Sequence, residues 1–371
     1  MSKPNKAGPR LRIALSTLEK IEPYKPGVSR IEGVANPMKL SSNENPFGPS
    51  PKAIKAVEKS TLKMHRYPEG SSKVLRDALA EKHGIDAERI VCGAGSDNIL
   101  ELLCQAYAGV GDEVLYSEHG FLIYPIAALR VGATPVKAPE KNLTTDVSAL
   151  LKAVTDKTKI VFIANPNNPT GSYLTRGEVK MLRDKLPPHI LLVIDCAYAE
   201  YVTEKDYTTG LELVAETENT AVTFTFSKIY GLASLRVGWG YLPTAVVDYV
   251  NRIRSPFNVS EQGQVAAVAA LKDNEFVKKS REHNTKWRDW LTHELSKLGI
   301  KVNPSQGNFI LAEFPSDKRR NADSANSFLQ SRGIIVRAVK GYGLPDHLRI
   351  SIGLEEEVRA VQEALEEFMK R

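Results

Sequence analysis

The chain has 371 residues, of which 42% are hydrophobic and 25% are charged. This composition is typical of a globular protein, and the length allows two or three domains or one large elaborated domain. It excludes a largely disordered chain, a collagen and a small disulfide-stapled protein. No apolar run approaches the roughly 18 residues of a membrane-spanning helix, so we expect no membrane association.

Fifty basic residues against 44 acidic ones give a formal net charge of +6. A positive excess can indicate a nucleic-acid-binding protein. Against that reading, the chain has no Lys- and Arg-rich block of about 5–8 residues, and basic and acidic residues alternate through its helical stretches. We therefore expect no nucleic-acid partner, and the modest excess suits small anionic substrates.

Three widely spaced cysteines, Cys92, Cys104 and Cys196, match neither a disulfide framework nor a zinc motif. They favour a reducing compartment, and we expect a cytoplasmic protein. The first 18 residues contain four basic residues and no acidic one. A targeting segment is one reading of that composition, but no secretory apolar core is present, and we interpret it as a polar arm.

Residues 1–50 are rich in Pro, Gly, Ser and Asn, which favours an extended arm with turns. We interpret them as an N-terminal arm that contributes a segment to the smaller of two domains. A helix-like stretch runs from Pro51 to about Lys63, with apolar residues at helical spacing.

From about residue 70 to 255, short β-rich runs alternate with amphipathic helical runs, and we assign residues 51–255 to a large domain. This alternation predicts an α/β domain with a mostly parallel seven-stranded sheet flanked by helices. The predicted strands are Ile90–Cys92, Val114–Ser117, Thr134–Val136, Ile160–Ala164, Ile190–Asp195, Ala221–Phe226 and Val237–Tyr241. The predicted helices between them include Asp97–Ala108, Asp146–Val154 and Thr175–Leu186.

Residues 256–371 follow a different order, which predicts a smaller α+β domain. The expected helices are Glu261–Leu271, Asn274–Leu298, Ala322–Arg332 and a last one from Glu355. The expected strands are Asn308–Glu313, Ile334–Arg337 and Leu348–Ile352.

Ligands of parallel sheets bind where the strands end, so the residues after each strand carry the functional signal. Gly93–Asp97 is a glycine-rich turn into a helix, where free backbone N–H groups favour an anion. It lacks the third glycine of the dinucleotide-binding pattern, and an ordinary strand-to-helix turn is the alternative. Asn165–Gly171 contains two Asn-Pro steps, which either present Asn168 to a ligand or build a rigid self-bonded loop.

Asp195 ends an apolar strand, where a charge is costly unless a cation pairs with it, although a helix N-cap would also explain it. Tyr198 lies close enough in sequence to face the same cleft. Lys228 follows another strand in an otherwise uncharged stretch. If it is desolvated there, its amine can act as a nucleophile; if it is exposed to solvent, it is an ordinary surface residue. Ser227 and Arg236 supply a hydroxyl and a guanidinium that suit a phosphate dianion.

These segments, taken in this order, resemble the fold-type-I aminotransferases, which depend on pyridoxal 5'-phosphate. The closer resemblance is to the histidinol-phosphate aminotransferase family, and it extends from about Ile21 to the end of the chain. Further matching motifs are Ser42–Pro46, Arg66–Gly70, Pro304–Phe309 and Val336–Arg349.

The resemblance implies that Lys228 holds the cofactor covalently and then moves a proton on the substrate. It implies that Asp195 pairs with the pyridine nitrogen, while Asn168 and Tyr198 bond the ring hydroxyl. The phosphate would be held by Ala94, Gly95, Ser96, Ser227 and Arg236, together with Tyr67 of a neighbouring subunit. A homodimer is therefore implied.

Phe121 matches the position where an aromatic ring stacks on the cofactor, although several members have tyrosine there. Arg349 matches the arginine that receives the substrate carboxylate, and Arg337 and Tyr24 match two more residues at the substrate anion. Without the resemblance, a surface charge or a core-edge tyrosine would be the preferred explanation of these residues. The implied reaction links L-histidinol phosphate and 2-oxoglutarate to imidazole acetol phosphate and L-glutamate. An aromatic amino acid aminotransferase and a phosphothreonine decarboxylase remain alternatives.

Overall fold

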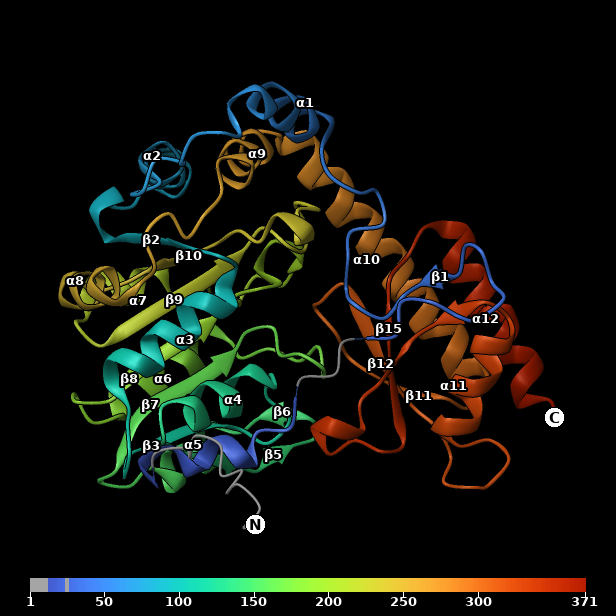
Figure 1. Cartoon of the computed structure of the whole chain (residues 1–371). Coiled ribbons are helices and arrows are strands. Elements are labelled where there is room, and N and C mark those ends of the chain that lie inside the picture. The colour runs from blue at the N-terminus through green and yellow to red at the C-terminus, as the bar shows by residue number, and fades with distance from the viewer. Residues whose placement is uncertain (1–12, 24–26) are drawn as a thin grey trace, which may run out of the picture.

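The computed structural model describes residues 13–23 and 27–371 (Figure 1). It contains two sheet-based units, with the long helix α10 (Asn274–Lys297) running from one towards the other. Within the described residues, we find no helix that combines the length and the apolar character needed to cross a bilayer.

The larger unit is built on a seven-stranded sheet with the order β2-β10-β9-β8-β7-β3-β4. Strand β10 runs antiparallel to both neighbours, and every other adjacent pair is parallel. The strands are β2 (Ile90–Gly93), β3 (Glu113–Ser117), β4 (Thr134–Ala138), β7 (Thr158–Ala164), β8 (Leu191–Asp195), β9 (Thr220–Thr225) and β10 (Gly238–Tyr241). The predicted fold class is confirmed.

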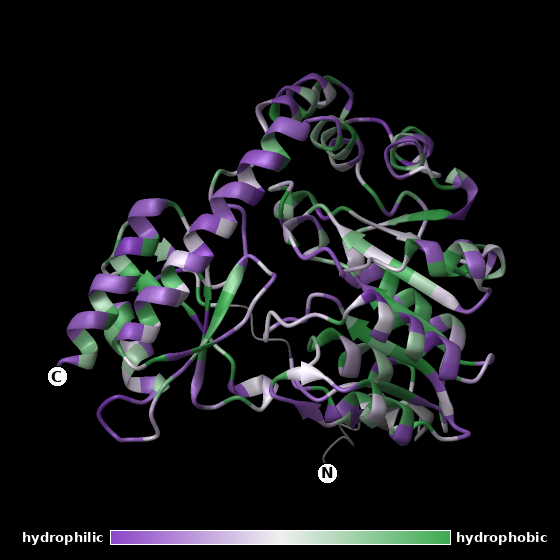
Figure 2. Ribbon diagram, turned by 180° about the vertical axis from the view of Figure 1, so that it is seen from behind, coloured by the Kyte–Doolittle hydropathy of each residue, from purple (hydrophilic) through white to green (hydrophobic). Residues whose placement is uncertain are grey.

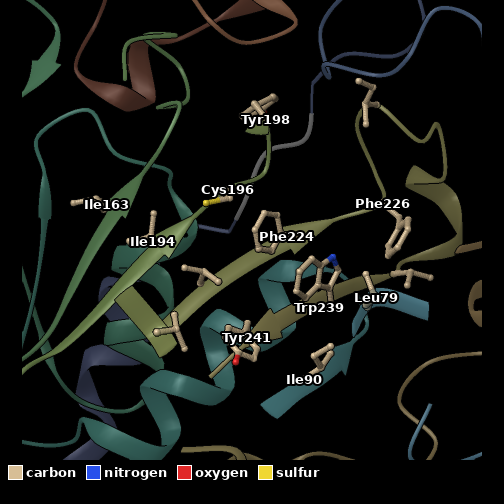
Figure 3. Close-up of a cluster of buried hydrophobic side chains, with 14 of the residues drawn as sticks. Leu79, Ile90, Ile163, Ile194, Cys196, Tyr198, Phe224, Phe226, Trp239 and Tyr241 are labelled. Carbon is tan, nitrogen blue, oxygen red and sulfur yellow. The ribbon is translucent and has the colours of Figure 1, made fainter. Parts of the chain in front are cut away.

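Two hydrophobic cores lie on opposite faces of this sheet. Alternate residues of β8 enter different cores: Leu192 and Ile194 face one, and Leu191 and Val193 face the other. A strand buried on both sides is therefore continuously apolar, which made β8 recognisable in the sequence. Figure 3 shows the first core, where Phe224 of β9 and Trp239 of β10 are cross-strand partners with ring centroids 4.3 Å apart.

Helices cover both faces of the sheet, and hydrophobic residues gather where they meet it (Figure 2). At the start of helix α6, Thr175 and Glu178 form a reciprocal capping box, a local sequence feature that favours the beginning of a helix there. The helices are α1 (Pro51–Ser60), α2 (Lys73–His83), α3 (Ser96–Tyr107), α4 (Ile123–Arg130), α5 (Val147–Ala153), α6 (Arg176–Lys185), α7 (Leu211–Glu216), α8 (Thr244–Ile253) and α9 (Glu261–Leu271). Two short strands, β5 (Glu140–Lys141) and β6 (Thr144–Thr145), form a separate hairpin.

The smaller unit has an antiparallel sheet in the order β11-β12-β15-β14, packed against α10, α11 and α12. Its elements are β11 (Lys301–Asn303), β12 (Phe309–Glu313), α11 (Ala322–Ser331), β14 (Arg337–Ala338), β15 (His347–Ser351) and α12 (Glu355–Met369). The single strand expected over Ile334–Arg337 is in fact two. β13 (Ile334–Ile335) pairs with β1 (Met38–Lys39), whereas β14 pairs with β15.

The chain enters the two units more than once. Strand β1 of the N-terminal arm lies in the smaller unit, and α1 then packs on α9 beside the larger sheet. Single turns of 3₁₀ helix complete the fold at η2 (Thr61–Lys63), η3 (Ala87–Arg89), η4 (Ala199–Tyr201), η5 (Ala233–Leu235) and η6 (Lys340–Tyr342), with the longer η1 (Ile13–Lys20) at the start. The expected boundaries at 50/51 and 255/256 stay predictions.

Gly238 permits a close contact between β10 and the start of α3. A Cβ atom there would lie 2.3 Å from the backbone nitrogen of Ser96 and 2.5 Å from the carbonyl carbon of Gly95. Because both are backbone atoms, Gly238→Ala should lower the free energy of unfolding by about 1–3 kcal/mol. Chemical denaturation measures this.

The matched control is Gly177→Ala in α6, where no atom lies within 4 Å of the new methyl group. That change should leave the free energy of unfolding unchanged or raise it by up to about 1 kcal/mol, because alanine is the better helix former. Equal stability of the two variants would contradict the close packing at Gly238.

Candidate active site

A cavity of about 200 Å³ lies where five strands of the larger sheet meet the smaller unit. Its wall includes residues that follow β2, β3, β7, β8 and β9, because the carboxyl ends of parallel strands share one edge. Four cationic and two acidic side chains face it, which favours an anionic ligand. The lining residues are Gly27, Ser41, Ser42, Asn43, Ser96, Asp97, Phe121, Ala164, Pro166, Asn168, Asp195, Ala197, Tyr198, Thr225, Ser227, Lys228, Ala233, Arg236, Arg337, Tyr342 and Arg349.

Most of the candidate residues named from the sequence lie in this one wall. They are Ser96, Phe121, Asn168, Asp195, Tyr198, Ser227, Lys228, Arg236, Arg337 and Arg349. Ala94 and Gly95 lie just before Ser96 and are not part of the lining, and Tyr67 lies elsewhere on the surface, 82% exposed. Tyr24 lies outside the described residues.

Asp195 is the last residue of β8, and its side chain is almost completely buried. Burial raises the pKa of its carboxyl group to about 7, against the effect of a hydrogen bond from Tyr124 Oη at 3.1 Å. In the described part of the chain, its hydrogen-bond partners are hydroxyl and amide groups rather than cations. The carboxylate is therefore prepared for a cationic group that a ligand brings.

Lys228 follows β9 and directs its amine into the same cavity as Asp195. Its Nζ donates to the carbonyl oxygen of Ser42 at 3.3 Å and lies 5.7 Å from the centroid of the Tyr198 ring. A carbonyl and an aromatic face stabilise an ammonium group without neutralising it. The amine thus faces the cavity, and a ligand could replace its contact with the carbonyl of Ser42.

An anion cradle lies at the start of α3. Arg236 has a left-handed backbone conformation, with φ of 52°, and its guanidinium donates to Ser227 Oγ at 3.4 Å. A Cβ atom on Gly95 would lie 2.5 Å from Arg236 Nη2, so only glycine allows the guanidinium to reach the helix start. Guanidinium, serine hydroxyls and the N-terminus of a twelve-residue helix together suit a phosphate group.

A second cationic pair faces the cavity from the smaller unit. Arg337 of β14 and Arg349 of β15 are directly opposite each other in the sheet register. Like charges at such positions repel, and an anion between them would relieve the repulsion. Arg349 also bridges the two units, since its Nη1 donates to Asn168 Oδ1 at 2.6 Å, and its buried Nε has no hydrogen-bond partner in the described part of the chain.

The structure adds contacts that the sequence analysis missed. Asn43 donates from Nδ2 to the Tyr198 hydroxyl at 2.9 Å, and Tyr124, stacked on Phe162, holds the Asp195 carboxylate. Asn43 lies in the polar Ser42–Pro46 motif, which was the available signal. Tyr124 lies in a helix that the sequence analysis did not predict, and nothing in its local sequence indicates this contact.

Comparison with known proteins agrees with this geometry. The family model for aminotransferase class I and II matches residues 35–365. The chain belongs to this family. A histidinol-phosphate aminotransferase of Rhodopseudomonas palustris is 54% identical to this aminotransferase over 350 residues, which cover 94% of this chain and 96% of that relative. One of Paramagnetospirillum magneticum is 54% identical over 349 residues, with the same two coverages. The predicted family resemblance is confirmed.

Solved structures are also similar to this aminotransferase. The crystal structure of histidinol-phosphate aminotransferase from Sinorhizobium meliloti in complex with pyridoxal 5'-phosphate has a TM-score of 0.85 and 27% sequence identity, and the match covers 92% of both chains. Aspartate aminotransferase from Thermus thermophilus has a TM-score of 0.80 at 23% identity, covering 90% of this chain and 92% of that one. The similarity to aspartate aminotransferase shows a shared fold and nothing further.

The raised pKa of Asp195 predicts a pH-dependent stability difference in the protein without cofactor. The folded state holds the proton up to about pH 7, whereas an unfolded aspartate loses it near the ordinary value of 3.8. Burial of the group therefore costs nothing below about pH 4, and its cost grows as the pH rises towards 7. The full cost is about 4 kcal/mol at most, at about 1.4 kcal/mol per pKa unit.

Asp195→Asn removes the buried charge, so the variant should gain stability over the unmodified protein at about pH 8 and lose that advantage near pH 4. Chemical denaturation of both proteins without cofactor, at several pH values, measures the difference. Glu200, whose pKa burial also raises to about 7, is present in both proteins and cancels. A difference that does not vary with pH would contradict the assignment.

Proposed function

We propose that this aminotransferase transfers an amino group between L-histidinol phosphate and 2-oxoglutarate, giving imidazole acetol phosphate and L-glutamate in histidine biosynthesis. The observation that carries the proposal is the Arg337–Arg349 pair beside Lys228 and Asp195, in a chain 54% identical to histidinol-phosphate aminotransferases over nearly its full length. Two guanidiniums suit a phosphate monoester in one half-reaction and a dicarboxylate in the other.

Pyridoxal 5'-phosphate is the cofactor, and the residues present fit it. The cavity offers an amine at Lys228, a buried carboxylate that lacks a cationic partner in the described part of the chain at Asp195, and an anion cradle around Arg236. These three groups match the aldehyde, the pyridine nitrogen and the phosphate of the cofactor. When bound, the cofactor supplies an electron sink that makes the substrate Cα–H bond easier to break.

Asp195 is assigned to hold a proton on the pyridine nitrogen. A cation beside the carboxylate offsets the desolvation that raises its pKa, so that Asp195 is ionised at neutral pH. Tyr124 and Thr223 orient the carboxylate by hydrogen bonds of 3.1 Å and 3.5 Å. Hydroxyl donors leave the carboxylate negative, which this role requires.

Lys228 is assigned to bind the cofactor covalently and then to move the proton at the substrate Cα atom. Tyr198 and Asn168 are assigned to the ring hydroxyl. Because the Tyr198 oxygen accepts a hydrogen bond from Asn43, its own proton is available to donate into the cavity. Phe121 supplies an apolar ring to the wall and has no hydroxyl with which to bond a ligand.

Ser96, Ser227 and Arg236 are assigned to the cofactor phosphate, with Ala94 and Gly95 contributing backbone. Arg349 is assigned to the substrate anion, and Arg337 joins it from the neighbouring strand. Tyr24 is assigned to the same anion by resemblance alone. The division places one anion site on each unit, which orients a substrate between them.

We also assign a homodimer in the cytoplasm. The segment around Tyr67 supports a dimer, because Leu62 and Met64 in the same stretch are 84% and 67% exposed, and such an apolar group is costly to leave in water. By resemblance, Tyr67 reaches the phosphate site of the partner subunit. Three buried, unpaired cysteines support a reducing compartment.

Half-reactions followed by cofactor absorbance test the proposed substrate. Histidinol phosphate alone should change the spectrum of the loaded enzyme, and phenylalanine should act at least about tenfold less efficiently. A faster response to phenylalanine would instead identify an aromatic aminotransferase. Release of carbon dioxide from phosphothreonine would identify the decarboxylase.

Two variants test the roles assigned to Lys228 and Arg337 in these half-reactions. Lys228→Ala should prevent borohydride from fixing the cofactor to the chain, and fixation at another lysine would refute that assignment. Arg337→Ala should lower kcat/KM for histidinol phosphate by about 10–100-fold and affect glutamate less, because a charge-assisted contact is lost. Equal losses for both substrates would contradict the phosphate contact.

Mixed dimers test the role of Tyr67. Tyr67→Ala and Lys228→Ala homodimers should both be weak, since each lacks one component in both sites. After subunit exchange, a mixed dimer should contain one complete site, formed by Lys228 of one subunit and Tyr67 of the other. Recovery of activity on mixing is expected, and no recovery despite subunit exchange would mean that Tyr67 does not act across the interface.

A further inference from the structure

The turn between β3 and α4 holds His119, two residues before Phe121 of the cavity wall. Its backbone is fixed within the larger unit, because His119 N donates to Glu140 Oε1 at 3.2 Å and Ser117 Oγ donates to the same oxygen. The carbonyl oxygen of His119 accepts from Asn167 Nδ2 at 3.4 Å, next to Asn168. The turn is therefore a rigid part of the cofactor side of the cavity.

The side chain of His119 reaches the smaller unit. Its Nδ1 lies 2.6 Å from the carbonyl oxygen of Tyr342, the last residue of η6. A carbonyl oxygen only accepts, so Nδ1 carries the proton and donates it. This hydrogen bond links the β3–α4 turn directly to a loop of the other unit.

Apolar packing accompanies the hydrogen bond. Leu122, three residues after His119, packs against the buried cluster of Leu311, Val339, Tyr342 and Leu344 in the smaller unit. One short turn thus meets one loop through a polar and an apolar contact. The partial burial of the hydrogen bond reduces competition from water.

This contact connects the two sides of the cavity. Tyr342 lines the cavity, and η6 begins two residues after β14, the strand that carries Arg337 opposite Arg349. The hydrogen bond of His119 therefore helps to fix the position of Tyr342 relative to Phe121. Because η6 begins two residues after β14, its position also bears on Arg337, which the proposed function assigns to the substrate anion.

We propose that His119 is a positioning residue that sets Tyr342 and Arg337 against the anionic group of the substrate by donating a hydrogen bond from the larger unit to the η6 loop. The proposal rests on the proposed function, since it names the substrate side of that site. Its role is geometric, because the imidazole is not among the side chains that line the cavity.

Three substitutions separate the hydrogen bond from the bulk of the ring. His119→Asn keeps a donor near the place of Nδ1, His119→Gln moves the donor one bond further out, and His119→Ala removes it. We expect Ala and Gln to raise KM for histidinol phosphate by about tenfold with kcat changed by less than about twofold, and Asn to stay close to the unmodified enzyme. His189→Ala, at an exposed histidine just before the start of β8, whose other end carries Asp195, is the matched control and should change nothing.

Hydrogen exchange of residues 340–344 in the substrate-free protein gives a readout independent of turnover. These amides should exchange about tenfold faster in the Ala and Gln variants than in the Asn variant. The proposal is overturned if Ala leaves both KM and exchange unchanged, or if Asn is as impaired as Gln. If Ala does not fold, the Asn and Gln pair decides alone. Should histidinol phosphate prove not to be a substrate, the proposed function fails while the exchange data still decide whether His119 holds η6.

Discussion

The buried carboxylate of Asp195 is the constraint on which the site depends. It ends a strand whose other residues are apolar, and its pKa is raised to about 7, chiefly because the carboxyl group is buried. The chain surrounds it with Tyr124 and Thr223, which orient the charge without neutralising it. An ion in such a place is unfavourable until a cation arrives, so the energy of cofactor binding and the ionisation of this group are coupled. Lys228 and Arg236 line the same cavity, and in the proposed function they supply the amine and the phosphate site for a ring whose nitrogen Asp195 would meet.

The second requirement is that two separate sheets meet at this edge. Arg349 connects them, because it lies in β15 of the smaller sheet and donates both to Asn168 of the larger unit and to the carbonyl of Ser41 in the N-terminal arm. The arm also bonds Tyr198 through Asn43. Asn303 Nδ2 donates to the carbonyl of Thr170, and His119 donates to that of Tyr342, so several directed hydrogen bonds join the units beside the apolar packing of Leu122. Such contacts fix geometry and add little net stability each, which suits a site whose two anion subsites must keep their spacing.

Much of the fold followed from local patterns. The strands β7, β8 and β9 are continuous apolar runs because helices cover both faces, and each was located to within one or two residues. The hydrophobic pattern did not predict α4, an eight-residue helix that contains Pro125 and packs against η1 and β4. It was also misleading at Ile334–Arg337, where one apolar run serves two partners. β13 pairs with the N-terminal arm and β14 with β15, a division that depends on segments about 300 residues apart in one case and about 12 in the other.

The sequence by itself determined the α/β class, the strand ends and the residue types placed there, since hydrophobic period and turn chemistry are local properties. It also determined the family, through motifs spread over most of the chain. Only the tertiary structure decided that Asn43 bonds Tyr198, that Tyr124 bonds Asp195 and that His119 reaches Tyr342. These contacts join residues from 71 to 223 positions apart, and each is a directional hydrogen bond whose partner is selected by how the sheets and the arm pack. A local pattern carries no record of that choice, because the same side chains would satisfy their polar groups equally well in water.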